Sequence, residues 1–215
     1  MQALTFWFDP ISPYAYLAFE HLPQALEGCS YVVDYRPVLF AGLLSHWGQL
    51  GPAEVAPKRA WTYRQVAWQA HRLGIDMALP AQHPFNPLPL LRLALASTAP
   101  GGLPNRRVVE QLMHHVWRGG ADANDPARLQ ALHAAVAPQR DPGSEPVKAE
   151  LRAHTDVAIE RGLFGVPALE LGGRLFWGLD ALPMVRAALL RDPWFDGPAG
   201  DAAAAARPGA SRSGG

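Results

Sequence analysis

The chain opens with two short runs of apolar residues of the kind that form strands, and a helical pattern lies between them. Residues 4–8 and 31–37 are rich in aromatic and β-branched side chains. Between them, leucines recur at helical spacing along residues 13–27, where Pro23 must kink or split the predicted helix. The opening therefore predicts a β-α-β unit.

The middle of the chain shows no convincing strand pattern, and its apolar positions follow the period of helices instead. In the first helical segment, Trp61 and Trp68 lie on one face, and we expect most of the seven tryptophans to pack in the core or within this middle part. The pattern predicts an all-helical insertion over residues 40–161. Pro- and Gly-rich joints separate its helical segments at residues 57–73, 87–97, 106–118 and 126–136.

The strand pattern returns near the end of the chain. Residues 168–171 and 174–177 are joined by Gly172-Gly173, and paired glycines accommodate the positive φ angles of a tight hairpin turn. Asp180 follows as a natural N-cap for a last helix that reaches residue 191. This part of the chain therefore predicts a β-β-α unit.

The order of elements is β-α-β, then helices, then β-β-α, which matches an α/β fold with a thioredoxin-like core and an inserted helical block. Neither end closes a sheet alone, so we expect residues 1–39 and 162–195 to form one thioredoxin-like domain around the insertion at 40–161. Thioredoxin-like folds keep a cis proline beside the active helix, and this resemblance predicts a cis Val166–Pro167 bond. Residues 196–215 have almost nothing to bury, so we predict a disordered tail.

Composition narrows the class of protein. The 215 residues are 49% apolar, which suits one globular core, and Lys plus Arg equal Asp plus Glu at 19 each. A net charge of zero gives no general attraction to nucleic acid or to an anionic membrane. No apolar run approaches transmembrane length and no charged-then-apolar leader opens the sequence, so we expect a cytoplasmic protein. Cys29 is the single cysteine, which excludes an internal disulfide, and we expect it to be a packed or surface thiol without chemistry.

The stretch FDPISPYAY, residues 8–16, carries the candidate chemistry. A strand ends at Asp9-Pro10, and Ser12-Pro13 begins a helix with serine as N-cap and proline at the first helical position. A helix N-terminus presents unpaired backbone N–H groups and the positive end of the helix dipole, which suit a bound anion. Thioredoxin-like proteins place a CxxC motif here, whereas this chain has Ser12 and Ala15. We therefore expect the site to host a thiolate that another molecule supplies.

Other chemistries find less support in the sequence. The absence of cysteine at positions 12 and 15 argues against a disulfide oxidoreductase. No GxSxG elbow is present and no histidine is placed beside Ser12, which argues against a serine hydrolase. The eight histidines include no HExxH pair, and His114 and His115 point apart on a helix, so we expect no metal site.

Motifs along the whole chain support a more specific hypothesis. With their order and spacing, residues 4–195 resemble the 2-hydroxychromene-2-carboxylate isomerases, which are glutathione-dependent relatives of the kappa-class glutathione transferases and of the DsbA-type oxidoreductases. The motifs that carry the resemblance are FDPISPYAYLA (8–18), Gly51-Pro52, Lys58, HPFNPLPLLRLALA (83–96), RGLFGVPALEL (161–171) and LFWGLDAL (175–182).

The resemblance implies roles for individual residues around bound glutathione. Ser12 matches the serine that contacts the glutathione sulfur, with a plain N-cap as the alternative. The backbone of Val166 matches the position that pairs with the cysteinyl part of the tripeptide. Leu179 and Asp180 match positions that hold its γ-glutamyl end. Lys58 matches a lysine that lines the site, although a lysine in a first helical turn is ordinarily only solvent-exposed.

The substrate side of the site departs further from the family pattern. Gln49 and Leu50 stand where relatives often carry an asparagine that faces the substrate, which leaves the substrate open. His83 and Asn86 in HPFN are pocket candidates by resemblance and turn residues by default.

The reaction of the family implies the function that we expect. Glutathione thiolate adds to the conjugated enone of the ring-opened substrate, the former double bond rotates, and elimination returns the trans isomer and glutathione. We therefore expect a glutathione-dependent cis–trans isomerase of a small aromatic substrate such as 2-hydroxychromene-2-carboxylate, with a homodimer among the expected states. The alternatives are a kappa-like glutathione transferase, which would consume glutathione, and a glutathione-binding module without catalysis.

Overall fold

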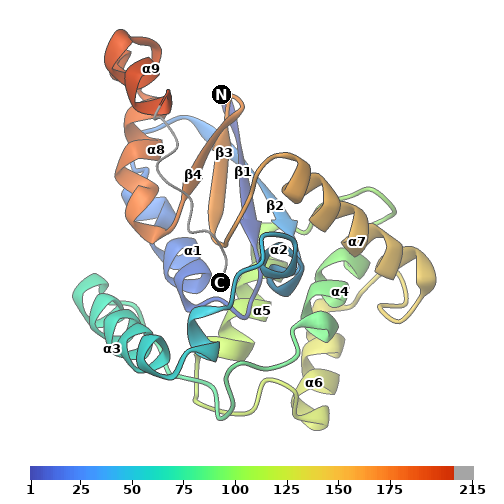
Figure 1. Cartoon of the computed structure of the whole chain (residues 1–215). Helices are drawn as coiled ribbons and strands as arrows, with labels where there is room; N and C mark the ends of the chain where they lie inside the picture. Colours follow the sequence, from blue (N-terminus) through green and yellow to red (C-terminus); the bar gives the residue numbers. More distant parts are fainter. Residues whose placement is uncertain (206–215) are drawn as a thin grey trace.

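A four-stranded sheet is the framework of the molecule in this computed structural model, which describes residues 1–205 (Figure 1). In space its strands follow the order β2-β1-β3-β4. Strand β1 is parallel to β2 and antiparallel to β3, and β4 is antiparallel to β3. The two ends of the chain therefore build one sheet, which confirms the predicted thioredoxin-like α/β fold. The strands are β1 (Gln2–Phe8), β2 (Tyr31–Pro37), β3 (Ala168–Leu171) and β4 (Arg174–Trp177).

Two glycines form the turn of the β3–β4 hairpin. Gly172 and Gly173 have φ angles of 57° and 81°, a left-handed conformation that side chains with a Cβ rarely adopt. This pair matches the two-residue hairpin turn that suits the twist of antiparallel strands. The hairpin predicted from the paired glycines is confirmed.

Alternation along β1 divides its side chains between two apolar clusters. Leu4, Phe6 and Phe8 belong to the main core, which includes residues of α1 (Pro13–Ala25), whereas Trp7 lies in a smaller cluster. The main core also takes in residues of α5 (Arg106–Trp117) and α8 (Leu182–Leu189), and the smaller cluster residues of α2 (Phe40–His46) and α7 (Glu145–Glu160). Helices therefore cover both faces of the sheet, as Figure 1 shows.

The chain between β2 and β3 is helical, and four of its helices match the segments predicted from the sequence. Helices α2 and α7 were not predicted individually. The division of the chain into separate domains remains a prediction. Besides α2, α5 and α7, this part contains η1 (Pro52–Glu54), α3 (Ala56–Leu73), α4 (Leu88–Ala96) and α6 (Pro126–Val136).

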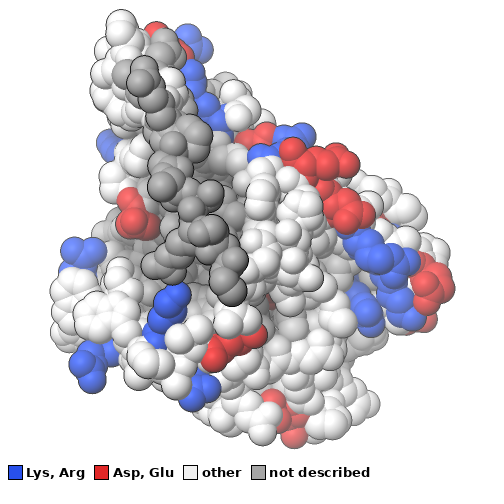
Figure 2. Space-filling model, viewed as in Figure 1, with Lys and Arg blue, Asp and Glu red and all other residues white. Residues whose placement is uncertain are grey.

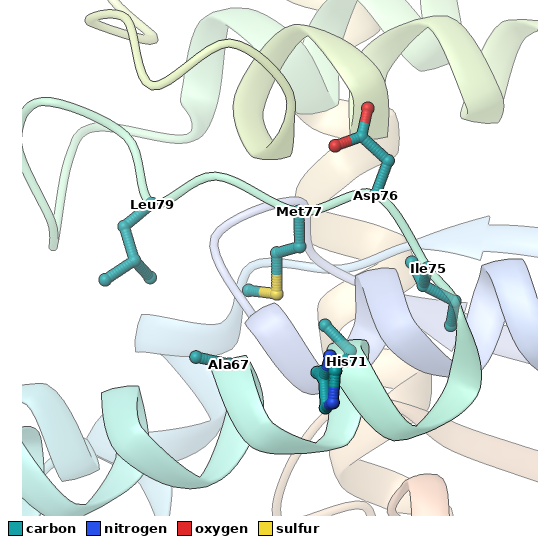
Figure 3. Close-up of a pocket in the computed structure, with 7 residues that line it drawn as sticks. Ala67, His71, Ile75, Asp76, Met77 and Leu79 are labelled. Carbon is teal, nitrogen blue, oxygen red and sulfur yellow. The ribbon is translucent and has the colours of Figure 1, made fainter.

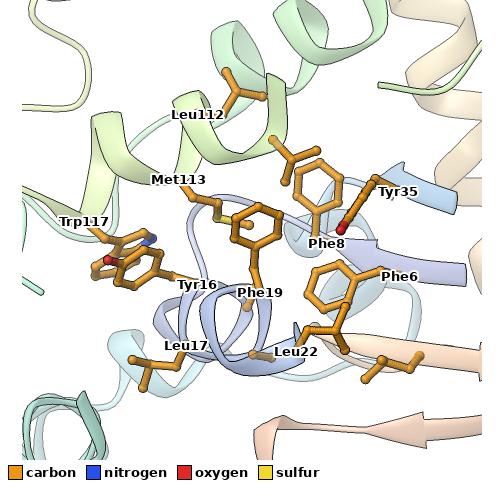
Figure 4. Packing of buried hydrophobic residues seen from close by; sticks show 14 of the residues in the cluster. Phe6, Phe8, Tyr16, Leu17, Phe19, Leu22, Tyr35, Leu112, Met113 and Trp117 are labelled. Atoms are coloured by element: carbon orange, nitrogen blue, oxygen red, sulfur yellow. The ribbon is translucent and has the colours of Figure 1, made fainter. Parts of the chain in front are cut away.

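Aromatic side chains dominate the centre of the main core (Figure 4). Phe6 of β1 contacts Phe19 of α1 and Tyr35 of β2 edge to face, with ring centroids 6.5 and 5.9 Å apart. Tyr16 of α1 stacks on Trp117 of α5 at 6.3 Å. Such pairs add to the stabilisation that burial of their large apolar area provides. The core thus fixes α1 between the sheet and α5.

Pro23 does not split α1, which runs without a break from Pro13 to Ala25. Proline has no N–H, so the carbonyl of Phe19, four residues earlier, lacks its helical donor. The Arg106 guanidinium donates to this carbonyl through both Nη1 and Nη2 at 3.4 Å and lies over the Phe19 ring, 4.2 Å from its centroid. Of the two expected outcomes, a kink or a split, the split does not occur, because a side chain from α5 satisfies the carbonyl that proline leaves free.

The expectation that most tryptophans are packed needs correction. Only Trp7 and Trp117 are buried, whereas five tryptophans are exposed: Trp47, Trp61, Trp68, Trp177 and Trp194. Helix α3, which carries Trp61 and Trp68, buries only Val66 and Ala70, and none of the five exposed tryptophans packs in the core.

The segment predicted to be a disordered tail is not uniformly without structure. After η3 (Pro193–Asp196), Pro198–Ala204 forms a helix, α9. Residues 206–215 of the predicted tail lie outside the described residues. None of the helices within the described part of the chain is both long enough and apolar enough to span a membrane.

Candidate functional site

Ser12 caps the N-terminus of α1 directly after β1. Its Oγ accepts a hydrogen bond from the backbone N–H of Ala15 at 3.2 Å, and Pro13 occupies the first helical position. This arrangement confirms the helix start predicted from Ser12-Pro13. Ser12 is only 6% exposed, so a charge placed beside it would be shielded from water by protein.

The same hydroxyl reaches across the molecule to the segment before β3. Ser12 Oγ donates to the carbonyl oxygen of Val166 at 3.1 Å, although the two residues are 154 positions apart in the chain. The Val166–Pro167 bond is cis, as the resemblance to thioredoxin-like folds predicted. Among the described residues, the N–H of buried Val166 has no hydrogen-bond partner. The structure thus brings a helix N-terminus, a hydroxyl and an unpaired backbone N–H together.

Asp9 stabilises the turn before Ser12, a role that was not predicted from the sequence. Its fully buried carboxylate accepts hydrogen bonds from the N–H groups of Ile11 and Phe40, each at 3.0 Å. Burial raises the pKa of Asp9 from 3.8 to about 7, against the lowering effect of the two hydrogen bonds. The carboxyl joins the turn before Ser12 to the start of α2. An aspartate followed by proline is a typical turn signal that pointed to this local structure.

Both ring nitrogens of His83 are engaged by protein groups. Nε2 lies 2.8 Å from the carbonyl oxygen of Ile11, and Nδ1 lies 2.8 Å from the hydroxyl of Tyr63. Burial lowers the pKa of His83, which favours the neutral ring. Asn86, the other pocket candidate of this segment, is exposed, and its Oδ1 accepts from the N–H of Leu88 at the start of α4. Both residues therefore have structural contacts that do not depend on a ligand.

Leu179 and Asp180 lie in a short 3-10 helix, η2 (Leu179–Ala181), next to the cis proline. Gly178 N–H donates to the carbonyl of Pro167 at 3.0 Å, which ties this turn to the Val166 segment. Asp180 does not cap α8, which begins at Leu182 without a side-chain cap, so the predicted N-cap was wrong. The short 3-10 turn separates Asp180 from the helix. The Asp180 charge instead raises the pKa of Tyr14 in α1, to a smaller extent than burial of that ring does.

Lys58, Gln49 and Leu50 are exposed, on the segment from the end of α2 to the first turn of α3. The turn between them is fixed locally, since Glu54 Oε1 accepts from the N–H of Gly51 at 2.7 Å. No hydrogen bond or ion pair of the described residues connects any of the three to Ser12. The structure therefore gathers Ser12, Val166 and the turn at residues 178–180, and leaves these three on the surface.

A separate cavity lies between α3 and the segment that follows it (Figure 3). It has a volume of about 300 Å³, at the lower end of the range for small-molecule sites. None of the site residues predicted from the sequence lines it, so we do not assign the candidate site to this cavity. Its lining residues are Ala67, Ala70, His71, Ile75, Asp76, Met77 and Leu79.

Within the described residues, one group of possible metal ligands lies between α1 and α5. Ligand atoms of Glu20, Glu110 and His114 lie within 4.8 Å of one another. Glu20 already accepts from His114 Nε2 at 2.8 Å and pairs with Arg118 at 3.4 Å. The Arg118 cation supplies the positive charge that this carboxylate needs, so we interpret the group as an ion-pair network.

Residues 3–190 match the DSBA-like thioredoxin domain family, which spans most of the chain. The chain belongs to this family. This DsbA-like chain has Ser12 and Ala15 where a CxxC motif would place its cysteines.

Curated relatives of this DsbA-like chain carry the names of two related activities. A 2-hydroxychromene-2-carboxylate isomerase of Sphingobium xenophagum is 28% identical over 196 residues, which cover 88% of this chain and 98% of the relative. A glutathione S-transferase kappa 2 of Caenorhabditis elegans is 27% identical over 215 residues, which cover 92% and 95%. The solved structure of a 2-hydroxychromene-2-carboxylate isomerase shares the fold with a TM-score of 0.76 at 23% identity, covering 90% of this chain and 97% of that one.

Proposed function

We propose that this DsbA-like protein is a glutathione-dependent enzyme that isomerises 2-hydroxychromene-2-carboxylate or a similar aromatic compound from cis to trans. The observation that supports this most is the Ser12 hydroxyl at the N-terminus of α1, hydrogen-bonded to the segment of the cis proline. Such a site favours a thiolate, and the chain has no cysteine there to supply one. One relative is named an isomerase and the other a glutathione S-transferase, which supports an enzyme of one of these two kinds.

The donors and acceptors around Ser12 suit the cysteinyl part of glutathione. When bound, glutathione would supply a thiolate that adds reversibly to a conjugated enone and so permits rotation about the former double bond. The N–H and C=O of Val166 can pair with a peptide backbone, and the carbonyl would then lose its need for the Ser12 proton. The hydroxyl could turn toward the sulfur. Ser12 thus acts in this proposal as a hydrogen-bond donor and not as a nucleophile.

Free-energy magnitudes support a useful shift in the thiol pKa. A free thiol has a pKa of about 8.5. A helix N-terminus contributes ~0.3–1 kcal/mol and a hydrogen bond to a charged group ~1.5–3 kcal/mol. Breaking the bond from Ser12 to Val166 costs about 1 kcal/mol of that gain. The remainder would lower the thiol pKa by about one to two units, since one unit is about 1.4 kcal/mol. Thiolate then becomes a major species at neutral pH.

Charge on α3 supports an anionic substrate. The helix contains Lys58, Arg59, Arg64 and Arg72 and no acidic residue, and none of these cations forms an ion pair within the described part of the chain. Figure 2 shows blue cationic side chains where Figure 1 places α3. We assign Lys58 to the developing enolate charge.

The remaining predicted residues complete the proposal. Leu179 and Asp180 would hold the γ-glutamyl end of glutathione, with Asp180 facing its ammonium group. Gln49, Leu50 and Asn86 would contact the substrate, which their exposure leaves accessible. The homodimer remains a prediction.

A disulfide trap tests where glutathione binds. Ser12→Cys places a thiol at the helix N-terminus, where its pKa falls. Its thiolate should attack oxidised glutathione, form a mixed disulfide and release one molecule of reduced glutathione. Peptide mass spectrometry should locate the adduct at position 12, and S-methylglutathione should protect it. The unmodified chain is the matched control, because its Cys29 lies beyond the opposite end of α1.

Product analysis during turnover distinguishes an isomerase from a transferase. We expect isomerisation of 2-hydroxychromene-2-carboxylate to require glutathione and to leave its concentration unchanged, whereas a transferase would consume it. At about one hundred times its dissociation constant, glutathione should also add ~2.7 kcal/mol to the free energy of unfolding. Unchanged melting together with no adduct at position 12 would refute the cofactor assignment.

A further inference from the structure

The peptide unit between Ile11 and Ser12 is held from both of its edges. On one edge, the N–H of Ser12 donates to the carbonyl of Asp9 at 3.0 Å. On the other, the Ile11 carbonyl accepts from His83 Nε2 at 2.8 Å. Because a peptide unit is planar, these two bonds fix its rotation and hence the direction in which Ser12 leaves it.

The surroundings of His83 select one form of its ring. The Ile11 carbonyl can only accept, so Nε2 carries the proton, and in the neutral ring Nδ1 then accepts from the Tyr63 hydroxyl. The ring packs against Trp117 and Phe85, with centroids 5.5 and 6.1 Å away. Burial among these rings lowers the pKa of His83 and keeps it neutral. Tyr63 can also donate to the carbonyl of His83 itself, at 3.1 Å.

We propose that His83 is a positioning residue, which holds the Ile11 carbonyl and thereby aims the Ser12 hydroxyl at the sulfur site. Tyr63 of α3 orients the His83 ring, so the placement of α3 is transmitted to Ser12 through two hydrogen bonds. Because the first turn of α3 carries Lys58, the same relay couples the proposed substrate-facing helix to the thiolate site. The inference rests on the proposed function and replaces direct substrate contact as the role of His83.

Three variants separate the two hydrogen bonds. His83→Phe keeps a ring of similar size and removes both bonds, whereas His83→Gln retains a donor for the Ile11 carbonyl. Tyr63→Phe removes only the hydroxyl that orients the ring. A small misplacement of a catalytic group can cost up to a hundredfold in rate. We expect His83→Phe to raise the thiol pKa of bound glutathione by about one unit, a tenfold loss of thiolate below that pKa. His83→Gln should restore most of the lost thiolate, and Tyr63→Phe should give a thiol pKa between those of the wild type and His83→Phe.

His115 provides a matched control. It too is a partly buried histidine whose Nε2 lies 2.8 Å from a backbone carbonyl, that of Ala123, and burial lowers its pKa. His115→Phe should therefore reduce the melting temperature in the same way as His83→Phe. It should leave the thiol pKa, measured by the ultraviolet absorbance of the thiolate, at the wild-type value. A pKa shift of equal size in both variants would show a general structural effect and overturn the proposal.

A double mutant tests whether His83 acts through Ser12. In a Ser12→Ala background, His83→Phe should change neither the thiol pKa nor kcat any further. Additive effects would mean that His83 acts independently of Ser12, and the proposal would fail. If His83→Phe raises KM for the substrate while the thiol pKa is unchanged, His83 is a substrate contact and positioning is excluded.

A readout without glutathione keeps the two proposals distinguishable. Hydrogen exchange of the Ser12 amide should be faster in His83→Phe than in the wild type, and unchanged in His115→Phe. If the wild type fails to bind glutathione but this exchange difference appears, the proposed function is wrong and the positioning of Ser12 stands. If the wild type binds glutathione and the exchange rate is the same in both variants, the positioning role is wrong.

Discussion

Helices α1 and α3 flank the candidate site and are built in different ways. Seven of the 13 residues of α1 are buried, whereas only Val66 and Ala70 are buried among the 18 residues of α3. The outward face of α3 carries Trp61 and Trp68, which are 60% and 57% exposed. The helix that presents Ser12 is therefore fixed by the core, and α3 relies on few apolar contacts.

Polar contacts compensate in part for the small number of buried residues in α3. Tyr14 of α1 donates to Gln65 of α3 at 2.6 Å, and Tyr63 of α3 bonds to His83. Hydrogen bonds of this kind contribute about 1 kcal/mol each, less than the burial of one large side chain. The proposed function therefore assigns the sulfur site to a helix fixed by packing and the substrate side to a helix with few buried contacts.

The largest loss of stability should come from the core side of the comparison. Phe19→Ala removes a fully buried ring that contacts Phe6 and Tyr35, so we expect the free energy of unfolding to fall by about 3–5 kcal/mol. Urea denaturation measures this directly. A loss below about 1 kcal/mol would contradict the view that α1 is fixed by packing.

The next largest effect concerns pH and Asp9. Its pKa is raised from 3.8 to about 7 in the folded state, so the folded protein keeps a proton that the unfolded chain releases. Stability is therefore present in full below about pH 4 and is lost as the pH rises to about 7, by roughly 4 kcal/mol.

Asp9→Asn removes this titration and is the matched variant. The difference in the free energy of unfolding between wild type and variant should decline between pH 4 and pH 7 and then stay constant. Urea denaturation across this range provides the measurement. Parallel curves for the two proteins would show that Asp9 does not titrate as its burial requires.

Ser12 offers a smaller effect on stability and a large one on activity. Ser12→Ala loses about 1 kcal/mol of capping, and Ser12→Gly only a few tenths, while both lose the bond to Val166. Both should lose roughly tenfold or more in kcat/KM, because neither has a hydroxyl for the thiolate. The activity loss should shrink as the pH rises, since bulk ionisation then supplies thiolate. Near wild-type turnover of the glycine variant at neutral pH would make Ser12 a cap alone.

Substitution of Arg106 tests how α1 tolerates Pro23 in its interior. Arg106→Met should cost about 1–3 kcal/mol, because the Phe19 carbonyl loses its donors. In the double variant with Pro23→Ala, the new N–H at position 23 should restore a helical hydrogen bond and recover part of that loss. Thermal unfolding of Arg106→Met, Pro23→Ala and the double variant gives the coupling free energy between the two positions. Strictly additive losses would show that Arg106 does not compensate for Pro23.

The smallest effect should come from the exposed side of α3. Trp61→Ala and Trp68→Ala remove large but solvated rings, so each should change the free energy of unfolding by less than about 0.5 kcal/mol. Arg72 lies over the Trp68 ring at 5.2 Å, an exposed contact of similar small value. A loss as large as that of Phe19→Ala would mean that α3 packs far more tightly than its burial indicates.

The sequence predicted the sheet well because strand signals there are local. Aromatic and β-branched runs identified β1 and β2, and the paired glycines identified the β3–β4 hairpin. Helix α7 escaped detection because its buried positions include Thr155 and Ala158, which give a weak apolar pattern. For the exposed tryptophans the prediction was wrong in the opposite direction, because it expected burial that does not occur. Helical periodicity shows which residues share a face but not whether another element packs against that face.

The site could be predicted only in part, because several of its contacts join residues that are far apart in the sequence. The cap at Ser12 was readable from the sequence, and its partner Val166 came only through the family resemblance. The contact between His83 and Ile11 crosses 72 positions and leaves no local pattern. Asp9 was missed because burial, which a turn motif does not report, gives that carboxyl its unusual pKa.

The pairing of β1 with β3 also sets when the site can exist during synthesis. Register partners such as Phe6 and Leu169 are separated by about 160 residues, so the ribosome adds the second strand roughly 8–30 s after the first. Until then β1 has β2 on one edge only, and Ser12 has no Val166 to meet. The intervening helices can form their local contacts during this interval. A nascent chain that stops before residue 166 therefore contains the helix N-terminus but lacks the segment that completes the proposed thiolate site.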